Sequence, residues 1–237
     1  MLKLEEVSFS YPSKKENKII DKMTFELEDA SFVSLIGPSG CGKTTVANLI
    51  AGYLVPNRGT IKVGAKLVTK PGRERFIINQ DDDLFEWMTV EQNVRFVARQ
   101  GIHKYLKLVH LEGHEKKYPY QLSGGMKKRA AIARALAADA GYLIIDEAFS
   151  SLDFQMKEHL YDELLSIWEQ TNKTILLITH DVDEAIFLSD RIIIFTKSPS
   201  RVKRVVKIPF ARPRRKGIKY SSRFIELKKK IENLIEV

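Results

Sequence analysis

The chain has 237 residues, 44% of them hydrophobic, which is enough to bury the core of one large domain or of a domain with an inserted subdomain. Its single cysteine excludes an internal disulfide and a four-cysteine zinc site, and its acidic N-terminal residues do not resemble a secretory leader, so we expect a reducing, cytoplasmic environment. The formal net charge of +9 is concentrated in residues 197–237, which carry 14 Lys and Arg against 3 Asp and Glu, so it gives no general reason to expect specific nucleic-acid binding.

Strands and helices are predicted in alternation along most of the chain. The first residues alternate in polarity as a β-strand does, and the charged turn at residues 13–18 indicates a hairpin with the strand that follows. The predicted strands are 2–11, 23–28, 31–37, 59–64, 75–79, 141–146, 173–179 and 191–196. The predicted helices are 46–54, 90–100, 104–111, 123–138, 154–171, 182–189 and 221–235. This order indicates an α/β fold with a parallel core between helices, an N-terminal antiparallel β subdomain and an inserted α-helical subdomain.

A glycine-rich loop connects the predicted strand 31–37 to a helix that begins near Lys43. It matches G-x-x-x-x-G-K-[ST], the phosphate-binding loop (P-loop), which predicts a P-loop NTPase core with a mixed sheet flanked by helices. Backbone N–H groups of such a loop face the phosphates of ATP, Lys43 neutralises them, and the Thr44 hydroxyl ligates Mg²⁺. The alternative is a glycine loop that binds nothing. The predicted nucleotide-binding residues of the loop are Gly37, Pro38, Ser39, Gly40, Cys41, Gly42, Lys43, Thr44 and Thr45.

Two carboxylates, Asp146 and Glu147, end the predicted strand 141–146. Parallel strands deliver the residues at their carboxyl ends to the ligand crevice of the sheet. We therefore expect Asp146 to hold Mg²⁺, directly or through water, and Glu147 to orient or deprotonate the attacking water. The alternative is that the two carboxylates only cap the next helix.

The segment Leu-Ser-Gly-Gly-Met at 122–126, together with the motifs above, resembles the signature of ATP-binding-cassette (ABC) ATPases. The resemblance implies that Ser123, Gly124 and Gly125 bind the γ-phosphate of an ATP molecule held by another subunit. It therefore implies a second copy of the chain, or a close relative, as a partner. The alternative is a turn that caps the helix 123–138, and the two interpretations are compatible.

The other landmarks of this family occur in order over residues 1–196. The resemblance implies that Tyr11 stacks on adenine and that Gln80 reaches Mg²⁺ and the attacking water. It also implies that Asp153 acts across the dimer and that His180 contacts the γ-phosphate as a catalytic residue. The alternatives are a plain strand-end tyrosine for Tyr11 and a structural histidine for His180.

Three further segments, 84–94, 118–126 and 208–214, resemble importers of the nitrate, sulfonate, taurine and pyrimidine-precursor type. That type implies an integral membrane permease as a partner, an external substrate-binding protein as an indirect one, and a peripheral location on the cytoplasmic face of the membrane. The chain departs from the pattern in having Ala148 and Glu86 where the family usually has proline, which removes a backbone restraint but no catalytic group. The rival interpretations are a non-transport ABC ATPase of DNA repair or the ribosome, a scaffold that only binds nucleotide, and a kinase.

The C-terminal residues form a basic extension without a catalytic motif. We expect a solvated basic face, with attraction to anionic lipid as an alternative and specific nucleic-acid binding as the least favoured one. Removal of residues 212–237 is accordingly expected to leave the phosphate chemistry formed. The predicted organisation is an ATP-binding core at 1–83 and 139–196, a helical signature subdomain at 84–138, and the extension at 197–237.

Overall fold

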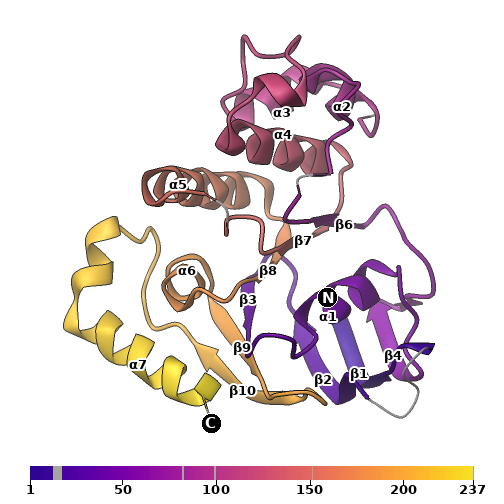
Figure 1. The fold of residues 1–237 in the computed structure, drawn as a ribbon, viewed down its shortest axis with the longest axis vertical. Coiled ribbons are helices and arrows are strands. Elements are labelled where there is room, and N and C mark those ends of the chain that lie inside the picture. Colours follow the sequence, from indigo (N-terminus) through magenta and orange to yellow (C-terminus); the bar gives the residue numbers. More distant parts are fainter. Residues whose placement is uncertain (13–17, 82, 99, 151, 237) are drawn as a thin grey trace. The chain divides into compact units, whose positions relative to one another are not determined.

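The chain divides into two compact units in a computed structural model (Figure 1). Unit 1 comprises Met1–Pro71 and Thr174–Val237, and unit 2 comprises Gly72–Lys173. The residues that the structure describes are 1–12, 18–81, 83–98, 100–150 and 152–236.

Unit 1 contains an antiparallel sheet formed by the N-terminal part of the chain. Its strands are β1 (Leu2–Phe9), β2 (Ile20–Leu27), β4 (Arg58–Val63) and β5 (Lys66–Leu67), in the order β2-β1-β4-β5. Leu4 pairs with Phe25 on one side and with Ile61 on the other, and all three side chains are buried. The predicted antiparallel β subdomain is therefore confirmed, whereas most of its predicted turn, residues 13–17, lies outside the described residues.

The parallel strands of unit 1 carry the loops that matter for function. This part of the unit consists of β3 (Phe32–Ile36), α1 (Lys43–Ala51), β8 (Thr174–Ile178), α6 (Val182–Leu188), β9 (Arg191–Phe195), β10 (Val202–Lys207), the 3-10 helix η3 (Lys216–Tyr220) and α7 (Ser222–Glu236). Strand β3 is parallel to both β8 and β9, and β10 adds to β9 in the antiparallel sense. All residues of β3 and β8 are buried, as expected for strands covered on both faces.

Helix α1 ends three residues before the predicted boundary, because Gly52 terminates it. Gly52 has a φ of 87°, and a Cβ atom there would lie 2.3 Å from the carbonyl oxygen of Lys70. Only glycine adopts this left-handed conformation at so close an approach of two backbone segments.

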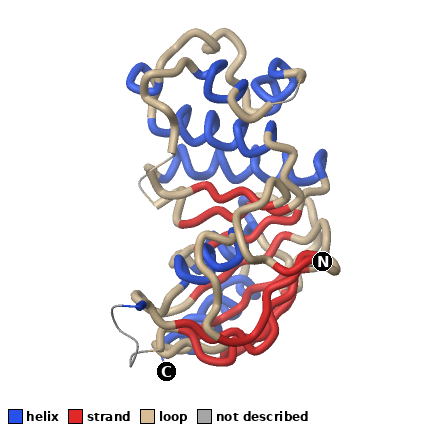
Figure 2. Tube along the Cα trace, turned by 90° about the vertical axis from the view of Figure 1, so that its right-hand side faces the viewer, coloured by secondary structure: helices blue, strands red, loops and turns tan. Residues whose placement is uncertain are grey.

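Unit 2 pairs two parallel strands and adds a group of helices. Its elements are β6 (Arg75–Ile78), α2 (Val90–Arg95), α3 (Ile102–Leu108), η2 (Pro119–Gln121), α4 (Gly124–Ala137), β7 (Tyr142–Asp146) and α5 (Phe154–Thr171). Helices α2 and α3 both pack on α4, and α4 lies beside α5, where Arg129 donates a 2.6 Å hydrogen bond to Glu163 (Figure 2). The α/β class with helices between parallel strands is thus confirmed, although α2 and α3 are shorter than predicted.

Candidate functional site

The P-loop lies between the carboxyl end of β3 and the amino end of α1, as the sequence predicts. Gly42, which precedes α1, has a φ of 98°, and no side chain caps the first N–H groups of the helix. Gly40 is also left-handed, with a φ of 72°, and a Cβ atom there would have no neighbour within 4 Å. The loop therefore offers backbone donors and the positive end of the helix dipole to an anion such as a phosphate.

Lys43 directs its ammonium group into this loop. Its Nζ atom donates to the carbonyl oxygens of Gly37 at 3.0 Å and Pro38 at 3.2 Å, and the residue is only 7% exposed. Thr44, by contrast, is exposed. A buried cation among the amides of a glycine loop is a donor set that fits the phosphates of a nucleotide.

Tyr11 lies close to the P-loop within unit 1. Its hydroxyl is 3.2 Å from the Thr45 hydroxyl, and its ring makes an edge contact with Phe9 at a centroid distance of 5.0 Å. The residue is still 36% exposed, which leaves ring surface for stacking. The hydrogen bond connects Tyr11 to a residue of the segment predicted to hold phosphates.

His180 follows β8, the strand next to β3. Leu35 of β3 is in register with Ile178, and Thr179 donates its N–H to the Leu35 carbonyl at 3.3 Å. The carboxyl ends of these two parallel strands meet at one edge, so His180 and the P-loop emerge from the same side of the sheet. His180 is exposed, which is consistent with contact to a ligand rather than with a core role.

The side chain of Cys41 is shielded from solvent. It is 1% exposed, and its burial raises the pKa of the thiol above the ordinary value. A Cβ atom at Gly37 would lie 3.1 Å from its Sγ atom, so the thiol packs inside the loop. It is therefore a packing residue of the P-loop with low reactivity at neutral pH.

Unit 2 brings the predicted acidic residues and Gln80 to neighbouring strand ends. Strands β6 and β7 are parallel with Ile78 in register with Ile145, so Asp146 is the last residue of β7 and Gln80 lies two residues beyond the carboxyl end of β6. Asp146 is 6% exposed, whereas Gln80 is exposed. The arrangement matches the placement from which a parallel sheet presents ligand-binding residues.

Glu147 has a left-handed backbone, with a φ of 47°. Its carbonyl accepts hydrogen bonds from the N–H of Ser150 at 3.2 Å and from the Ser150 hydroxyl at 2.9 Å. A non-glycine residue in this conformation is uncommon and is often found at functional sites. Ala148 follows it and is 1% exposed, so the position where the family has proline is packed in the interior.

The predicted signature residues begin helix α4. Ser123 is the N-cap, and its hydroxyl accepts from the Met126 N–H at 3.3 Å, which confirms the capping role. Asp153 is the N-cap of α5 in the same way, through the Met156 N–H at 2.9 Å. A Cβ atom at Gly125 would lie 2.6 Å from the Met156 sulfur, so the two helix starts lie close together. Ser151, two residues before Asp153, lies outside the described residues.

Two buried cations of α4 that the sequence analysis did not single out hold the segment after Gln80. Lys128 Nζ donates to the Gln80 carbonyl, and Arg134 donates to the Asp83 carbonyl at 2.5 Å. Arg134 also lies over the Phe85 ring at 5.5 Å. Both residues are at most 6% exposed. The sequence signal that could have revealed them is a basic residue on the buried side of α4, among alanine and isoleucine residues.

Three aromatic side chains lie together in the segment after Gln80, and two of them are exposed. Trp87 is 72% exposed and Phe96 is 64% exposed, and both rings contact Phe85, at 5.3 and 5.0 Å between centroids. Buried Asn93 fixes this turn by donating to the carbonyls of Phe85, Met88 and Thr89, each at 3.1 Å. We call Phe85, Trp87 and Phe96 the aromatic patch.

A P-loop at the end of a parallel strand, beside a histidine from the next strand and a tyrosine bonded to the loop, defines a P-loop nucleotide-binding protein. The family model for ABC transporters matches residues 20–150. An uncharacterized ABC transporter ATP-binding protein of Methanocaldococcus jannaschii is 43% identical over 92% of this chain and 85% of its own length. The chain therefore belongs to the ABC transporter family as an ATP-binding ATPase.

Two other comparisons agree with this membership. The aliphatic sulfonates import ATP-binding protein SsuB of Bacillus cereus is 39% identical over 90% of this chain and 87% of its own length. Among solved structures, a dimeric bacterial ABC transporter cassette is 27% identical with a TM-score of 0.76, over 89% of this chain and all of that one. A second structure of that cassette is a dimer in a post-hydrolysis state bound to ADP and phosphate, with the same identity, TM-score and coverage. Among the described residues, no helix is both long and apolar enough to span a membrane.

Proposed function

We propose that the chain is the ATP-hydrolysing subunit of an importer and that it energises transport of a small solute through a separate membrane permease. The observation that carries this proposal is the similarity to proteins named for import of aliphatic sulfonates, which extends over 90% of the chain. The importer role implies a peripheral location on the cytoplasmic face of the membrane, beside the permease.

In this function the residues of unit 1 bind ATP. The amides at the start of α1 and the Lys43 ammonium hold the β- and γ-phosphates, and the Tyr11 ring stacks on adenine. His180 contacts the γ-phosphate and makes the site sensitive to its presence. Thr44, Gln80 and Asp146 offer hydroxyl, amide and carboxylate oxygens, the ligands that Mg²⁺ prefers, and would hold an ion that would neutralise charge on the phosphates.

Hydrolysis requires that a water molecule attack the γ-phosphorus in line with the leaving ADP oxygen. Glu147 orients this water and accepts its proton, while the bond between the γ-phosphorus and the bridging oxygen breaks. Lys43 and His180 stabilise the charge on the transferring group. The products are ADP and inorganic phosphate.

Assembly into a dimer completes each site. We propose that Ser123, Gly124 and Gly125, at the amino end of α4, bind the γ-phosphate of ATP held by a second copy of the chain, and that Asp153 acts across the same interface. The 14-residue α4 presents uncompensated N–H groups and a positive dipole end there, which favours an anion. ATP thus holds two copies together, and hydrolysis releases them.

The aromatic patch is the proposed contact with the permease. An exposed tryptophan and phenylalanine on a turn fixed by a buried asparagine form a preorganised apolar surface, which suits a short permease helix. The exposure of Trp87 argues against packing of its side chain inside the helical group. Lys128 and Arg134 connect this turn and Gln80 to α4, the helix that begins with the signature residues. A movement of the turn caused by the permease would therefore be linked to the position of groups that contact ATP.

The test compares two substitutions with different expected results. Glu147→Gln keeps the shape of the side chain but removes the charge that activates water, so ATP binds while hydrolysis falls by about 10²- to 10⁴-fold. Size-exclusion chromatography in Mg-ATP should then show a dimer. Lys43→Ala removes the cation from the phosphates, so neither tight ATP binding nor an ATP-dependent dimer is expected.

Phosphate release is measured beside the chromatography, with the permease present if the isolated subunit dimerises weakly. A Glu147→Gln protein that hydrolyses ATP at the parental rate would refute the catalytic assignment. A dimer that forms equally well with and without ATP would refute the proposed assembly.

A further inference from the structure

Helix α6 lies between His180 and the basic extension. It begins two residues after His180, and its C-terminal end contacts the basic extension. It has only seven residues, and a helix of that length is not stable on its own in water. Its position must therefore be determined by the groups that hold it.

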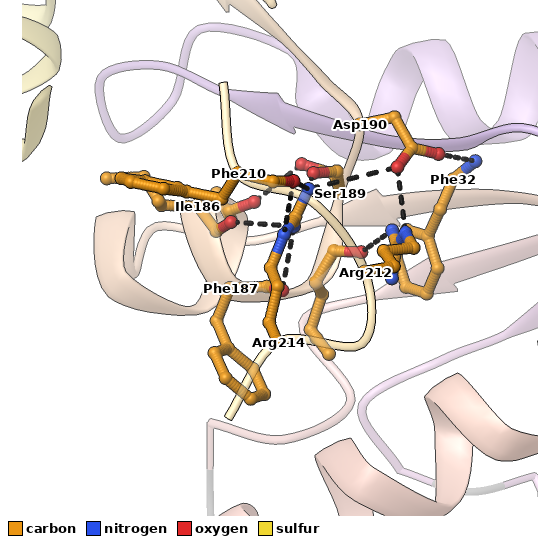
Figure 3. A network of polar contacts seen from close by, with 10 residues as sticks. Phe32, Ile186, Phe187, Ser189, Asp190, Phe210, Arg212 and Arg214 are labelled. Carbon is orange, nitrogen blue, oxygen red and sulfur yellow. Dashed lines mark hydrogen bonds and ion pairs between the residues drawn. The ribbon is translucent and has the colours of Figure 1, made fainter. Parts of the chain in front are cut away.

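The C-terminal end of α6 is held by Arg214. One guanidinium nitrogen, Nη1, donates to the carbonyl oxygens of Ile186 at 2.9 Å, Phe187 at 2.8 Å and Ser189 at 2.7 Å (Figure 3). The last carbonyls of a helix have no intrahelical partner, so Arg214 supplies the missing donors. The residue is 6% exposed, and burial together with nearby Arg212 lowers its pKa to about 10, which still leaves it charged at neutral pH.

Arg212 extends the network from α6 to strand β3. It donates to the Leu188 carbonyl at 2.5 Å and to the Asp190 carboxylate at 2.9 Å. The other oxygen of Asp190 accepts the N–H of Phe32 at 3.2 Å, at the start of the strand that leads into the P-loop. The extension therefore contacts the backbone of α6 and, through Asp190, that of β3.

The N-terminal turn of α6 is held by the final helix. Lys228 of α7 donates to the Asp183 carboxylate at 2.8 Å, and this bond raises the pKa of Lys228. Asp181 caps the same turn by accepting the N–H groups of Asp183 at 2.9 Å and Glu184 at 3.2 Å. Glu232 of α7 adds negative charge near Lys228.

The apolar side of α7 packs against the same elements. Phe224 and Ile231 are 1% and 0% exposed and belong to one buried cluster with Ile186 of α6 and Ile36. Ile36 is the last residue of β3 before the P-loop. The extension thus packs on α6 and shares a buried cluster with the last residue of β3.

We propose that the C-terminal part of the extension, residues 208–236, is a positioning element for His180, and that Arg214 and Lys228 act by holding α6 at its two ends. This inference rests on the proposed contact of His180 with the γ-phosphate. Arg214 and Lys228 touch no nucleotide in this scheme. They determine where α6 begins, and so where the histidine stands when ATP rather than ADP is bound.

The test measures how strongly the protein distinguishes ATP from ADP. The dissociation constants of both nucleotides are measured with Mg²⁺ by calorimetry on the full chain, in a Glu147→Gln background that prevents hydrolysis. Arg214→Lys keeps the charge but loses the fork of donors, and we expect the ratio of the ADP to the ATP constant to fall about 5-fold, the size expected for a weakened bond to a charged group. Affinity for ADP should not change.

The matched control is Arg215→Lys, the same chemical change at the next residue, which is exposed. It should leave the ratio unchanged. A second pair is Lys228→Ala against Lys229→Ala, for which we expect a fall of about 2-fold and no change respectively, because an exposed ion pair holds its partner less firmly. This pair keeps the test decisive if Arg214→Lys does not fold.

The same substitutions are repeated with His180→Ala. If Arg214 acts through His180, Arg214→Lys has no further effect on the ratio once the histidine is gone. Three results would overturn the inference while leaving the proposed function intact. They are an equal effect of Arg214→Lys with and without His180, an unchanged ratio of the ADP to the ATP constant in folded Arg214→Lys and Lys228→Ala proteins, and an equal loss of affinity for ADP and ATP. If His180→Ala alone leaves the ratio unchanged, the proposed role of His180 fails, and the inference fails with it.

Discussion

Phe224→Ala tests whether helix α7 is an integral part of unit 1. The Phe224 side chain is 1% exposed and stacks on Phe210 at a centroid distance of 5.9 Å. Truncation of a buried phenylalanine to alanine costs about 3–5 kcal/mol, which is a large part of the roughly 5–15 kcal/mol that stabilises a domain. With a slope of about 2–3 kcal/mol per molar urea, the unfolding midpoint should fall by about 1–2.5 M.

Urea unfolding is followed by far-UV circular dichroism and by tryptophan fluorescence. Both tryptophans, Trp87 and Trp168, lie in unit 2, so their fluorescence reports that unit, whereas the dichroism also reports unit 1. Ile225→Ala is the control, because Ile225 is the next residue and is 43% exposed, and its effect should stay within about 0.5 kcal/mol. Equal midpoints for the two variants by dichroism would show that α7 does not pack as described.

Four other predictions concern the interior of the two units. Cys41 should react slowly with thiol reagents at pH 7 and faster at higher pH, because its raised pKa keeps the thiol protonated at pH 7. Mg-ATP should slow the labelling further, and rapid labelling of the native protein would contradict the burial of the thiol. Asn93→Ala should cost about 2–3 kcal/mol, measured by thermal unfolding, because it leaves buried carbonyls without their donor. Gly52→Ala should destabilise unit 1 more than Gly64→Ala, since both residues have a positive φ but only Gly52 faces another backbone, and equal unfolding temperatures would contradict this packing. Removal of residues 212–237 should lower the stability of unit 1, an effect that the expectation from sequence, which concerned only the phosphate chemistry, did not address; an unchanged melting temperature would show that these residues do not stabilise the unit.

Local motifs made much of the site predictable from sequence. The P-loop carries its own strand and helix signals, and Ser123 is both a cap residue and a signature residue, so their positions follow from short segments of the chain. Strand β10 was not predicted, because its sequence VKRVVK has charged residues that obscure the alternation expected of a strand. It forms because β9 offers an edge with which it pairs.

The role of Arg214 could not have been predicted in the same way. Its partners are carbonyl groups at residues 186–189, and backbone carbonyls leave no trace in a sequence. The left-handed backbone of Glu147 was hidden for a similar reason, because nothing in the residue type requires it. The contacts of Arg214 depend on tertiary structure rather than on local propensity.

The distribution of charge in the extension changes how its basic composition should be interpreted. Arg212 and Lys228 form ion pairs with Asp190 and Asp183, and Arg201 donates to the Asp21 carboxylate at 3.1 Å. Arg214 is buried on carbonyl groups. These cations are hydrogen-bonded or ion-paired within unit 1, and the paired carboxylates offset part of their charge. The positive net charge of the extension is therefore in part a consequence of how it is attached, and only its other, solvent-exposed cations are available to a polyanion.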